Sequence, residues 1–201
     1  MQRARLLSLK NAMDRSLAGA GLLAFSPLML SLACLIRLRM GSPVLVRQIR
    51  IGYRGRQFRF LKFRTMTNAR DSFGRLLPDE RRLTPLGRFL RASSLDELPQ
   101  MWNVLKGEMS LVGPRPLLPE YLPRYNARQR RRHDIKPGIT GWAQVNGRAS
   151  LPWSERIELD LYYIEHRSLS LDLQILRRTV AIVLGGSGTY KGAAGGWEGK
   201  L

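Results

Sequence analysis

The sequence predicts an α+β fold in which one long apolar helix precedes a mainly helical domain with a small β-hairpin. Residues 16–36 contain no charged side chain and are about as long as one membrane span. Residues 44–66 alternate in polarity around a glycine-containing turn, which is the pattern of a β-hairpin. From residue 84 to residue 184, apolar side chains recur at helical spacing in several segments.

These patterns divide the 201 residues into three parts. Residues 1–40 form the membrane helix with its basic flank, and residues 41–185 form the main domain. Residues 186–201 are a Gly-rich tail without periodicity. The length allows one domain with a short appendage, and it excludes an enzyme with many membrane spans.

The apolar segment is interrupted by Ser26 and Pro27, and we expect a bend there because proline removes a backbone donor. Basic residues flank the segment on both sides, and such residues prefer the cytoplasmic face of a membrane. A re-entrant helix, whose two ends stay on that face, satisfies both flanks. A straight span and the buried helix of a soluble protein are the alternatives. A lipoprotein cleavage box at residues 31–34 fits poorly, because no flexible segment follows it.

The β-hairpin turns at residues 52–55, and its arginines form a basic face that suits lipid headgroups or, more simply, solvent. Residues 68–83 are polar, and we expect a loop there. Thr84 is placed to cap a short helix whose first residue is Pro85.

A second helix is expected from Ser94, with Gly107 in the position of a helix-ending glycine. Further along, the pattern predicts short strands, turns and helices in alternation. They are a strand at 109–112, a rigid turn at 113–116, a helix at 120–133, an irregular segment at 140–148, and helices at 152–166 and 173–184.

The net charge is +19, from 34 Lys and Arg against 15 Asp and Glu, and it indicates an anionic partner. That partner is a nucleic acid, an anionic membrane surface or a phosphorylated substrate. One cysteine excludes an internal disulfide and a Cys-based zinc finger. His133 and His166 lack the spacing of metal ligands, and no phosphate-binding loop with a G-x-x-x-x-G-K-[ST] pattern is present.

The pair Asp96 and Glu97 follows Ser94 at the expected start of a helix, and it has two interpretations. In the first, Ser94 and Glu97 form a capping box, and the acids simply favour the helix dipole. In the second, one carboxylate attacks an electrophile while the other holds a divalent metal. Arg91, upstream of the pair, would then hold an anionic substrate.

Three more segments offer cations or polar groups, and each also has a purely structural interpretation. Pro114 and Pro116 stiffen the backbone around Arg115, which gives either a rigid turn or a preorganised guanidinium for phosphate. Lys62 and Arg64 end the hairpin as phosphate contacts or as solvated charges. Residues 137–148 form a Gly-rich loop that packs Trp142 in the core or presents a ligand site. Its candidate ligand contacts are Gln144, Asn146 and Arg148.

Four strings in order closely resemble the bacterial sugar transferase family, whose members are monotopic phosphoglycosyl transferases. The strings lie at residues 62–66 (KFRTM), 94–107 (SLDELPQ and WNVLKG), 110–116 (SLVGPRP) and 136–148 (KPGITGWAQVNGR). The resemblance runs from about residue 13 to about residue 183 and corresponds to the minimal form of the family.

The resemblance implies a reaction: sugar-1-phosphate moves from a UDP-sugar to undecaprenyl phosphate, and polyprenyl-diphospho-sugar and UMP are released. Asp96 would be the nucleophile of a ping-pong mechanism with a covalent aspartyl-phosphosugar intermediate. Glu97, with Asp96, would bind Mg²⁺, and Arg91 and Arg115 would hold phosphate. This step begins the synthesis of an exopolysaccharide or another glycoconjugate. The implied location is the cytoplasmic face of the bacterial inner membrane, beside anionic lipids.

The alternative from another class is a membrane-attached basic protein that binds nucleic acid or anionic lipid. We expect no nucleic acid, because neither a helix-turn-helix pattern nor an aromatic-basic strand signature is present. The sugar of the donor cannot be read from the sequence.

Overall fold

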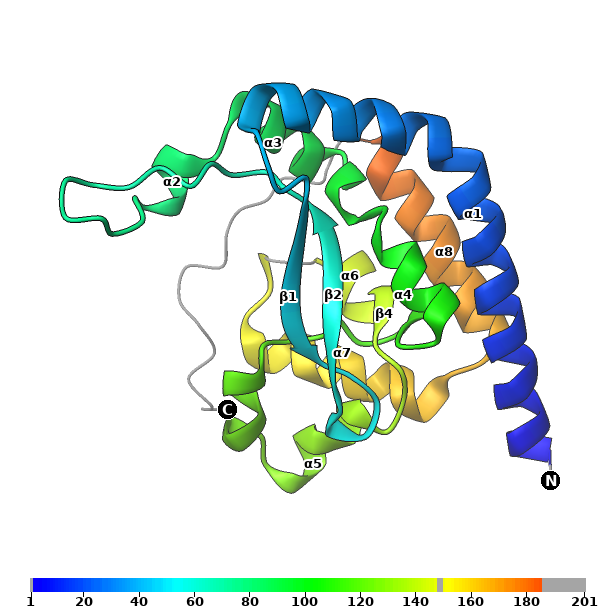
Figure 1. Cartoon of the computed structure of the whole chain (residues 1–201). Helices are drawn as coiled ribbons and strands as arrows, with labels where there is room; N and C mark the ends of the chain where they lie inside the picture. The colour runs from blue at the N-terminus through cyan, green and yellow to red at the C-terminus, as the bar shows by residue number, and fades with distance from the viewer. Residues whose placement is uncertain (1, 148–149, 186–201) are drawn as a thin grey trace.

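The computed structural model describes residues 2–147 and 150–185, and in the first helix it describes side chains from Ser8 onward. It confirms the predicted α+β fold, a mainly helical body with two small sheets (Figure 1). Helix α1 (Gln2–Met40) runs up one side of the body, changes direction and continues across the top. The Gly-rich tail lies outside the described residues.

Helix α1 stays continuous through Pro27, and a neighbouring hydroxyl replaces the hydrogen bond that proline cannot donate. In a regular helix the amide of residue 27 would donate to the carbonyl of Leu23. Here the Oγ atom of Ser26 donates to that carbonyl at 2.8 Å, and the Oγ atom of Ser31 donates to the carbonyl of Pro27 at 3.0 Å. The predicted interruption is therefore a bend within one helix.

The apolar side chains of α1 are divided between the domain and the exterior. Ala18, Leu32 and Ile36 are buried against the domain. Leu23 and Leu30 are 78% and 71% exposed. By length and composition, the stretch from Ser8 to Met40 is the one described helix that could cross a membrane, and it lies near the N-terminus.

The predicted hairpin is confirmed as strands β1 (Leu45–Ile51) and β2 (Gln57–Phe63), which pair antiparallel around the turn η1 (Tyr53–Gly55). Side chains alternate between the two faces of a strand, so Phe58, Phe60 and Lys62 share a face. The two phenylalanines pack in a core with Ala18, Val104 and Met109. Lys62 is therefore directed toward the interior side of the hairpin.

The predicted loop at 68–83 projects from the body and contains the short helix α2 (Asp79–Arg82) (Figure 1). Helix α3 (Pro85–Ala92) begins as predicted: the Oγ1 atom of Thr84 accepts from the amide of Gly87 at 2.9 Å. The helix ends beside Ser94, and the acidic pair follows immediately.

The helix predicted from Ser94 is wrong in form. Ser94 adopts a left-handed conformation with φ of 58°, and its side chain makes no capping hydrogen bond. One 3₁₀ turn, η2 (Leu95–Glu97), comes first, and α4 (Gln100–Lys106) begins only after Pro99. The capping-box interpretation is thus also wrong. Gly107 ends α4 at φ of 82°, as predicted.

Strand β3 (Ser110–Val112), predicted at 109–112, pairs in parallel with β4 (Gly138–Thr140), and Ser110 is opposite Gly138. The single helix predicted at 120–133 is wrong, because prolines and an Asn cap divide it. Its pieces are η3 (Pro119–Arg124), α5 (Ala127–Arg130) and η4 (Arg131–His133).

The segment predicted as irregular after residue 140 contains one helical turn, α6 (Trp142–Val145). Helix α7 (Trp153–His166) agrees with the prediction. Helix α8 (Leu169–Leu184) begins earlier than predicted, because the Oγ atom of Ser168 caps it by accepting from the amide of Leu171 at 3.2 Å. Helix α7 crosses behind the hairpin in the view of Figure 1, and α8 runs beside α1. Tyr163 of α7 and Ile175 of α8 pack in one core with Val112 of β3.

Candidate active site

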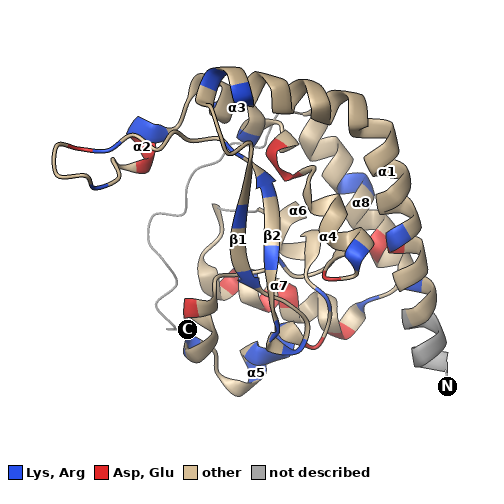
Figure 2. Ribbon diagram, in the orientation of Figure 1, with Lys and Arg blue, Asp and Glu red and all other residues tan. Residues whose placement is uncertain are grey.

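The two sequence-predicted acids lie in η2, the short turn between α3 and α4. This turn packs against β2, whose last residues carry Lys62. Figure 2 shows an acidic segment of the ribbon near the basic end of the hairpin. The fold therefore brings together charges that lie far apart in the sequence, and they come from β2, α3, η2 and the turn after β3.

Asp96 is the buried member of the pair, with 6% of its surface exposed. Burial raises the pKa of its carboxyl to about 6, and the negative charge of Glu97 adds to the rise. The positive charges of Lys62, Arg115 and Arg91 act in the opposite direction. Asp96 is therefore a desolvated carboxylate surrounded by cations, and it is mostly ionised at neutral pH.

Glu97 forms an ion pair with Arg115 in which both guanidinium nitrogens donate to the carboxylate. Burial alone would raise the pKa of Glu97, but the charge and hydrogen bonds of Arg115 outweigh it, and the side-chain amide of Gln100 acts in the same direction as Arg115. The net pKa lies below its usual value. The two acids thus differ in their ease of ionisation. Arg115 favours the charged form of Glu97, whereas burial disfavours the charged form of Asp96.

Lys62 and Arg91 supply two further cations that act on Asp96. Burial and the nearby charge of Arg91 lower the pKa of Lys62, while Asp96 partly restores it. The Nε atom of Arg91 donates to the Oγ1 atom of Thr65 at 3.0 Å, which orients the guanidinium. These groups resemble a site for a multiply charged anion, in which cations are fixed before the ligand arrives.

Arg64 is placed differently from its predicted role as a phosphate contact. It is 5% exposed, its Nε atom donates to the carbonyl of Met66 at 2.8 Å, and its Nη1 atom donates to the carbonyl of Ser42 at 2.7 Å. These contacts join the end of β2 to the residues after α1. They give Arg64 a structural role, and no described contact brings it to the acids.

The residues of the Gly-rich loop are only partly brought to the site. Asn146 donates to the carbonyl of Trp142 at 2.7 Å and accepts from Arg178 at 3.0 Å. The Trp142 ring packs on Tyr162 with ring centroids 5.9 Å apart, so it is engaged with α7 and α8. Both amide atoms of Gln144 are buried without a hydrogen-bond partner among the described residues. Arg148 lies outside the described residues.

The turn that carries Arg115 is held through its backbone by four hydrogen bonds from three segments, β1, η4 and β4. The Gly138 amide donates to the carbonyl of Pro114 at 3.0 Å, and the Ile51 amide donates to the carbonyl of Leu117 at 3.0 Å. The two carbonyls between them accept from arginine side chains. Arg132 donates to Arg115 at 2.9 Å, and Arg50 donates to Pro116 at 3.3 Å.

Sequence reasoning missed three residues that support this site: Gln100, Asn103 and Arg132. Gln100 is fully buried, and its side-chain amide helps to lower the pKa of Glu97. Asn103 joins α4 to β2, because its Nδ2 atom donates to the carbonyl of Arg59 at 2.7 Å and its Oδ1 atom accepts from the amide of Leu61 at 3.2 Å. The signal that could have found the two amide residues is helical periodicity. Gln100 and Asn103 lie on the buried face of the helix that follows the acids, where apolar side chains are usual.

A metal site made by protein alone is absent from the described part of the chain, which contains no group of three or more His, Cys, Asp or Glu side chains suited to a metal. Asp96 and Glu97 nevertheless fit Mg²⁺. This ion prefers oxygen, keeps several waters and is commonly held by one or two carboxylates together with substrate phosphates. The donor set therefore suits a magnesium ion that arrives with a phosphorylated substrate.

Comparison with known proteins gives a consistent result. The family model described as bacterial sugar transferase matches residues 5–186. An uncharacterised sugar transferase, EpsL, of Bacillus subtilis is 53% identical over 176 residues, which cover 88% of this chain and 87% of the relative. The exopolysaccharide production protein ExoY of Rhizobium meliloti is 36% identical and covers 90% and 88% of the two chains.

A longer relative carries a more specific name. The UDP-glucose:undecaprenyl-phosphate glucose-1-phosphate transferase of Xanthomonas campestris is 43% identical over 193 residues. The match covers 90% of this chain, which spans only 40% of the length of that relative. The activity in that name is therefore a property of the larger protein.

Proposed function

Because this chain belongs to the bacterial sugar transferase family, we propose that it transfers sugar-1-phosphate from a UDP-sugar to undecaprenyl phosphate. The products are polyprenyl-diphospho-sugar and UMP, and the step initiates exopolysaccharide or other glycoconjugate synthesis. The observation that carries this proposal is the meeting of Asp96 and Glu97 with Lys62, Arg91 and Arg115 at one place. Such a site suits a diphosphate, whose reacting phosphorus is shielded by negative oxygens.

In the proposed mechanism Asp96 is the nucleophile. Its carboxylate oxygen attacks the β-phosphorus of the UDP-sugar, the bond to the bridging oxygen breaks, and UMP leaves with that oxygen. A phosphate oxygen of undecaprenyl phosphate then attacks the same phosphorus, and the bond to Asp96 breaks. The carboxylate is restored, and the two substrates use one site in turn.

The remaining charged residues bind and orient the substrates. Arg115 and Arg91 hold phosphate oxygens, and Lys62 compensates negative charge next to Asp96. Arg115 would exchange its present partner Glu97 for the substrate, which frees Glu97 for Mg²⁺. Mg²⁺ held by Glu97 and Asp96 would neutralise part of the diphosphate charge.

We also propose that α1 is re-entrant and that the domain lies at the cytoplasmic face of the inner membrane. Both ends of α1 contact the same body: Lys10 donates to Asp172 of α8 at 2.7 Å, and Ile36 is fully buried in a core with Phe63 and Leu90. A straight span would place these ends on opposite sides of the bilayer. Exposed leucines between them are available to lipid, and the basic hairpin suits anionic headgroups.

The first experiment measures UMP release from a panel of UDP-sugars with undecaprenyl phosphate and Mg²⁺ in nanodiscs. Wild type and Asp96→Ala run side by side. We expect UMP with one donor and only from wild type, and a phosphosugar adduct on Asp96 by mass spectrometry. Equal UMP release from wild type and from Asp96→Ala would overturn the assignment of Asp96 as the nucleophile. Absence of UMP with every donor, including the UDP-glucose in the name of the Xanthomonas campestris relative, would overturn the reaction.

The topology has its own test. Single cysteines are introduced at residues 3 and 47 of a Cys34→Ser protein in intact cells, and labelling by a membrane-impermeant maleimide is compared before and after permeabilisation. A re-entrant helix predicts that both positions react only after permeabilisation. Reaction of either one in intact cells would support a straight span.

A further inference from the structure

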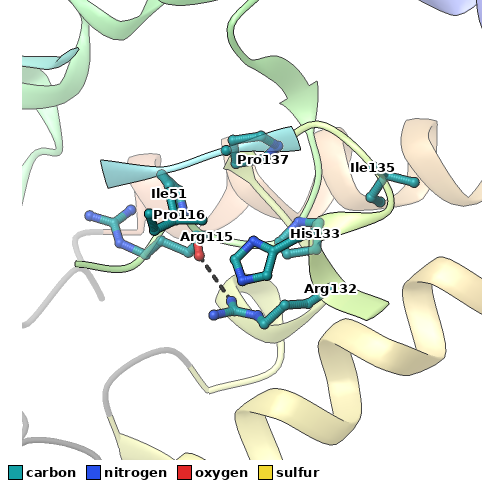
Figure 3. Close-up of a pocket in the computed structure, with 9 residues that line it drawn as sticks. Ile51, Arg115, Pro116, Arg132, His133, Ile135 and Pro137 are labelled. Atoms are coloured by element: carbon teal, nitrogen blue, oxygen red, sulfur yellow. Dashed lines mark hydrogen bonds between the residues drawn. The ribbon is translucent and has the colours of Figure 1, made fainter. Parts of the chain in front are cut away.

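The carbonyl of Arg115 is held by a buried guanidinium that belongs to a separate part of the chain. The Nη2 atom of Arg132 donates to this carbonyl at 2.9 Å (Figure 3). The Arg115 side chain extends away from Arg132 (Figure 3). Its guanidinium forms the ion pair with Glu97. Arg132 therefore contacts the backbone behind the substrate-facing guanidinium and does not reach the acids itself.

Both terminal nitrogens of Arg132 are fixed by further partners. Its Nη2 atom also donates to Asp160 of α7 at 2.6 Å, and its Nη1 atom donates to the hydroxyl of Tyr125 at 2.6 Å. The side chains of Arg132 and Asp160 are 3% and 5% exposed. Because Asp160 binds the same nitrogen that donates to Arg115, a shift of α7 or of Asp160 would be transmitted to the turn.

A buried ion pair is a poor way to stabilise a fold. Removing two charges from water costs as much as their attraction returns, and apolar side chains of similar volume usually stabilise as well or better. An apolar side chain cannot, however, donate to the Arg115 carbonyl. What distinguishes this pair is that it places a charged donor at the Arg115 carbonyl. A hydrogen bond from a charged donor is stronger than one between neutral groups.

We propose that Arg132, oriented by Asp160 and Tyr125, is a positioning residue that sets the place of the Arg115 guanidinium in the active site. The inference rests on the proposed function, since it assigns Arg115 to phosphate. Loss of the outer partner of a metal ligand typically costs about 10–100-fold in activity, and we expect an effect of the same order when Arg115 loses the partner of its backbone. The effect should be carried entirely by Arg115.

The test is a double-mutant cycle on the membrane enzyme in nanodiscs, with UMP release as the readout. Arg132→Met removes the donors and keeps the volume, and we expect kcat/KM for the UDP-sugar to fall about 10–100-fold. In an Arg115→Met background the same change should cause no further loss. Losses that multiply would overturn the proposal, because a purely structural effect does not depend on Arg115.

The matched control is Arg131→Met. Arg131 is adjacent, also joins η4 to α7 through an ion pair with Glu165 at 2.9 Å, and has no contact with the Arg115 turn among the described residues. We expect its kcat/KM to equal that of wild type. A loss equal to that of Arg132→Met would show that weakened packing of η4 on α7 is the cause, and it would overturn the proposal.

A second variant and a structural measurement cover two ways in which this experiment could fail. If Arg132→Met does not fold, Tyr125→Phe removes one hydrogen bond from Arg132 and takes its place in the same cycle, with the same expected lack of additivity. If wild type releases no UMP, the proposed function fails, and the inference is tested on structure alone. The Arg132→Met structure should then show Arg115 displaced from Glu97, and an unchanged ion pair would contradict us.

Discussion

The Nε atom of Arg91 donates to the hydroxyl of Thr65 at 3.0 Å, and this bond joins α3 to the residues that follow the hairpin. The carbonyl of Thr65 accepts from the Thr84 amide at 3.4 Å, at the start of the same helix. Thr65 therefore sets both the beginning of α3 and the direction of an arginine near its end. The conformation of one buried residue thus helps to decide where a cation that acts on Asp96 lies.

We predict that Thr65→Val lowers activity more than stability. Valine keeps the shape but cannot accept from Arg91, so the guanidinium loses its orientation. The loss of one hydrogen bond should reduce the free energy of unfolding by about 1 kcal/mol. We expect kcat/KM to fall while kcat changes less, because binding of the donor phosphate is weakened. Thr65→Ser, which keeps the hydroxyl, should retain activity, and an equal defect in both variants would contradict this role.

Gly87→Ala should separate α3 from the hairpin. A Cβ atom at this position would lie 1.9 Å from the Thr65 carbonyl oxygen, so the backbone of one element has to move. Overpacking of this kind typically costs about 1–3 kcal/mol. We expect a lower melting temperature and a loss of activity larger than that of Thr65→Val. The control is Gly19→Ala, whose Cβ atom would lie at an ordinary 3.7 Å from Leu105. It should leave activity unchanged and should not lower the melting temperature, because alanine favours a helix interior more than glycine does.

Asp96→Asn should abolish turnover and raise stability at neutral pH. The pKa of Asp96 is about 6 in the folded protein, against 3.8 for an unperturbed aspartate, so its ionisation opposes folding as pH rises between these values. Asparagine does not ionise. The variant should therefore gain up to about 3 kcal/mol above pH 6, and the gain should vanish near pH 4. Unfolding curves at several pH values give the answer, and a destabilised variant at pH 7 would contradict the raised pKa.

The pH dependence of the reaction should follow the same carboxyl. The nucleophile must be ionised, so kcat/KM should rise tenfold per pH unit below about 6 and level off above it. On the alkaline side, burial lowers the pKa of Lys62, so activity should decline at a lower pH than an ordinary lysine would give. Lys62→Arg should move the alkaline decline of kcat/KM to higher pH. The rise of kcat/KM on the acid side should stay at the same pH.

Pro27→Ala should straighten α1 by restoring the amide that Leu23 lacks. The Ser26 hydroxyl would then no longer be needed at the Leu23 carbonyl. We expect a longer distance between spin labels at the two ends of α1 in nanodiscs, and weaker packing of Ile36 on the domain. An unchanged distance would show that the contacts at both ends, rather than proline, impose the bend.

The sequence predicted the local elements well where one residue decides them. Pro85 and Thr84 determine the start of α3, Gly107 determines the end of α4, and strict alternation determines the hairpin. It failed where a tertiary contact decides the form. Ser94 is left-handed and a 3₁₀ turn follows it, so the chain forms no regular helix here. This backbone brings Asp96 close to the cations.

The same distinction applies to the site. Lys62, Arg91, Asp96, Glu97 and Arg115 were predicted as functional residues, and the fold gathers them. Arg64 was predicted as a phosphate contact because it lies near Lys62 in the sequence, but the structure turns it to the backbone carbonyls of Met66 and Ser42. Arg132 belongs to a run of arginines in the sequence, and only its burial in the fold distinguishes it from its neighbours.

The long apolar helix α1 contributes buried side chains to the domain as well as an exposed apolar surface. Ala18 lies in one hydrophobic core of the domain, Leu32 and Ile36 lie in another, and Asp14 accepts from buried Ser110 at 2.6 Å. An enzyme without residues 2–40 would open both cores and remove the carboxylate that Ser110 binds. Helix α1 is therefore an integral part of the folded domain, and the cores that support β2, α3 and α4 cannot be complete without it.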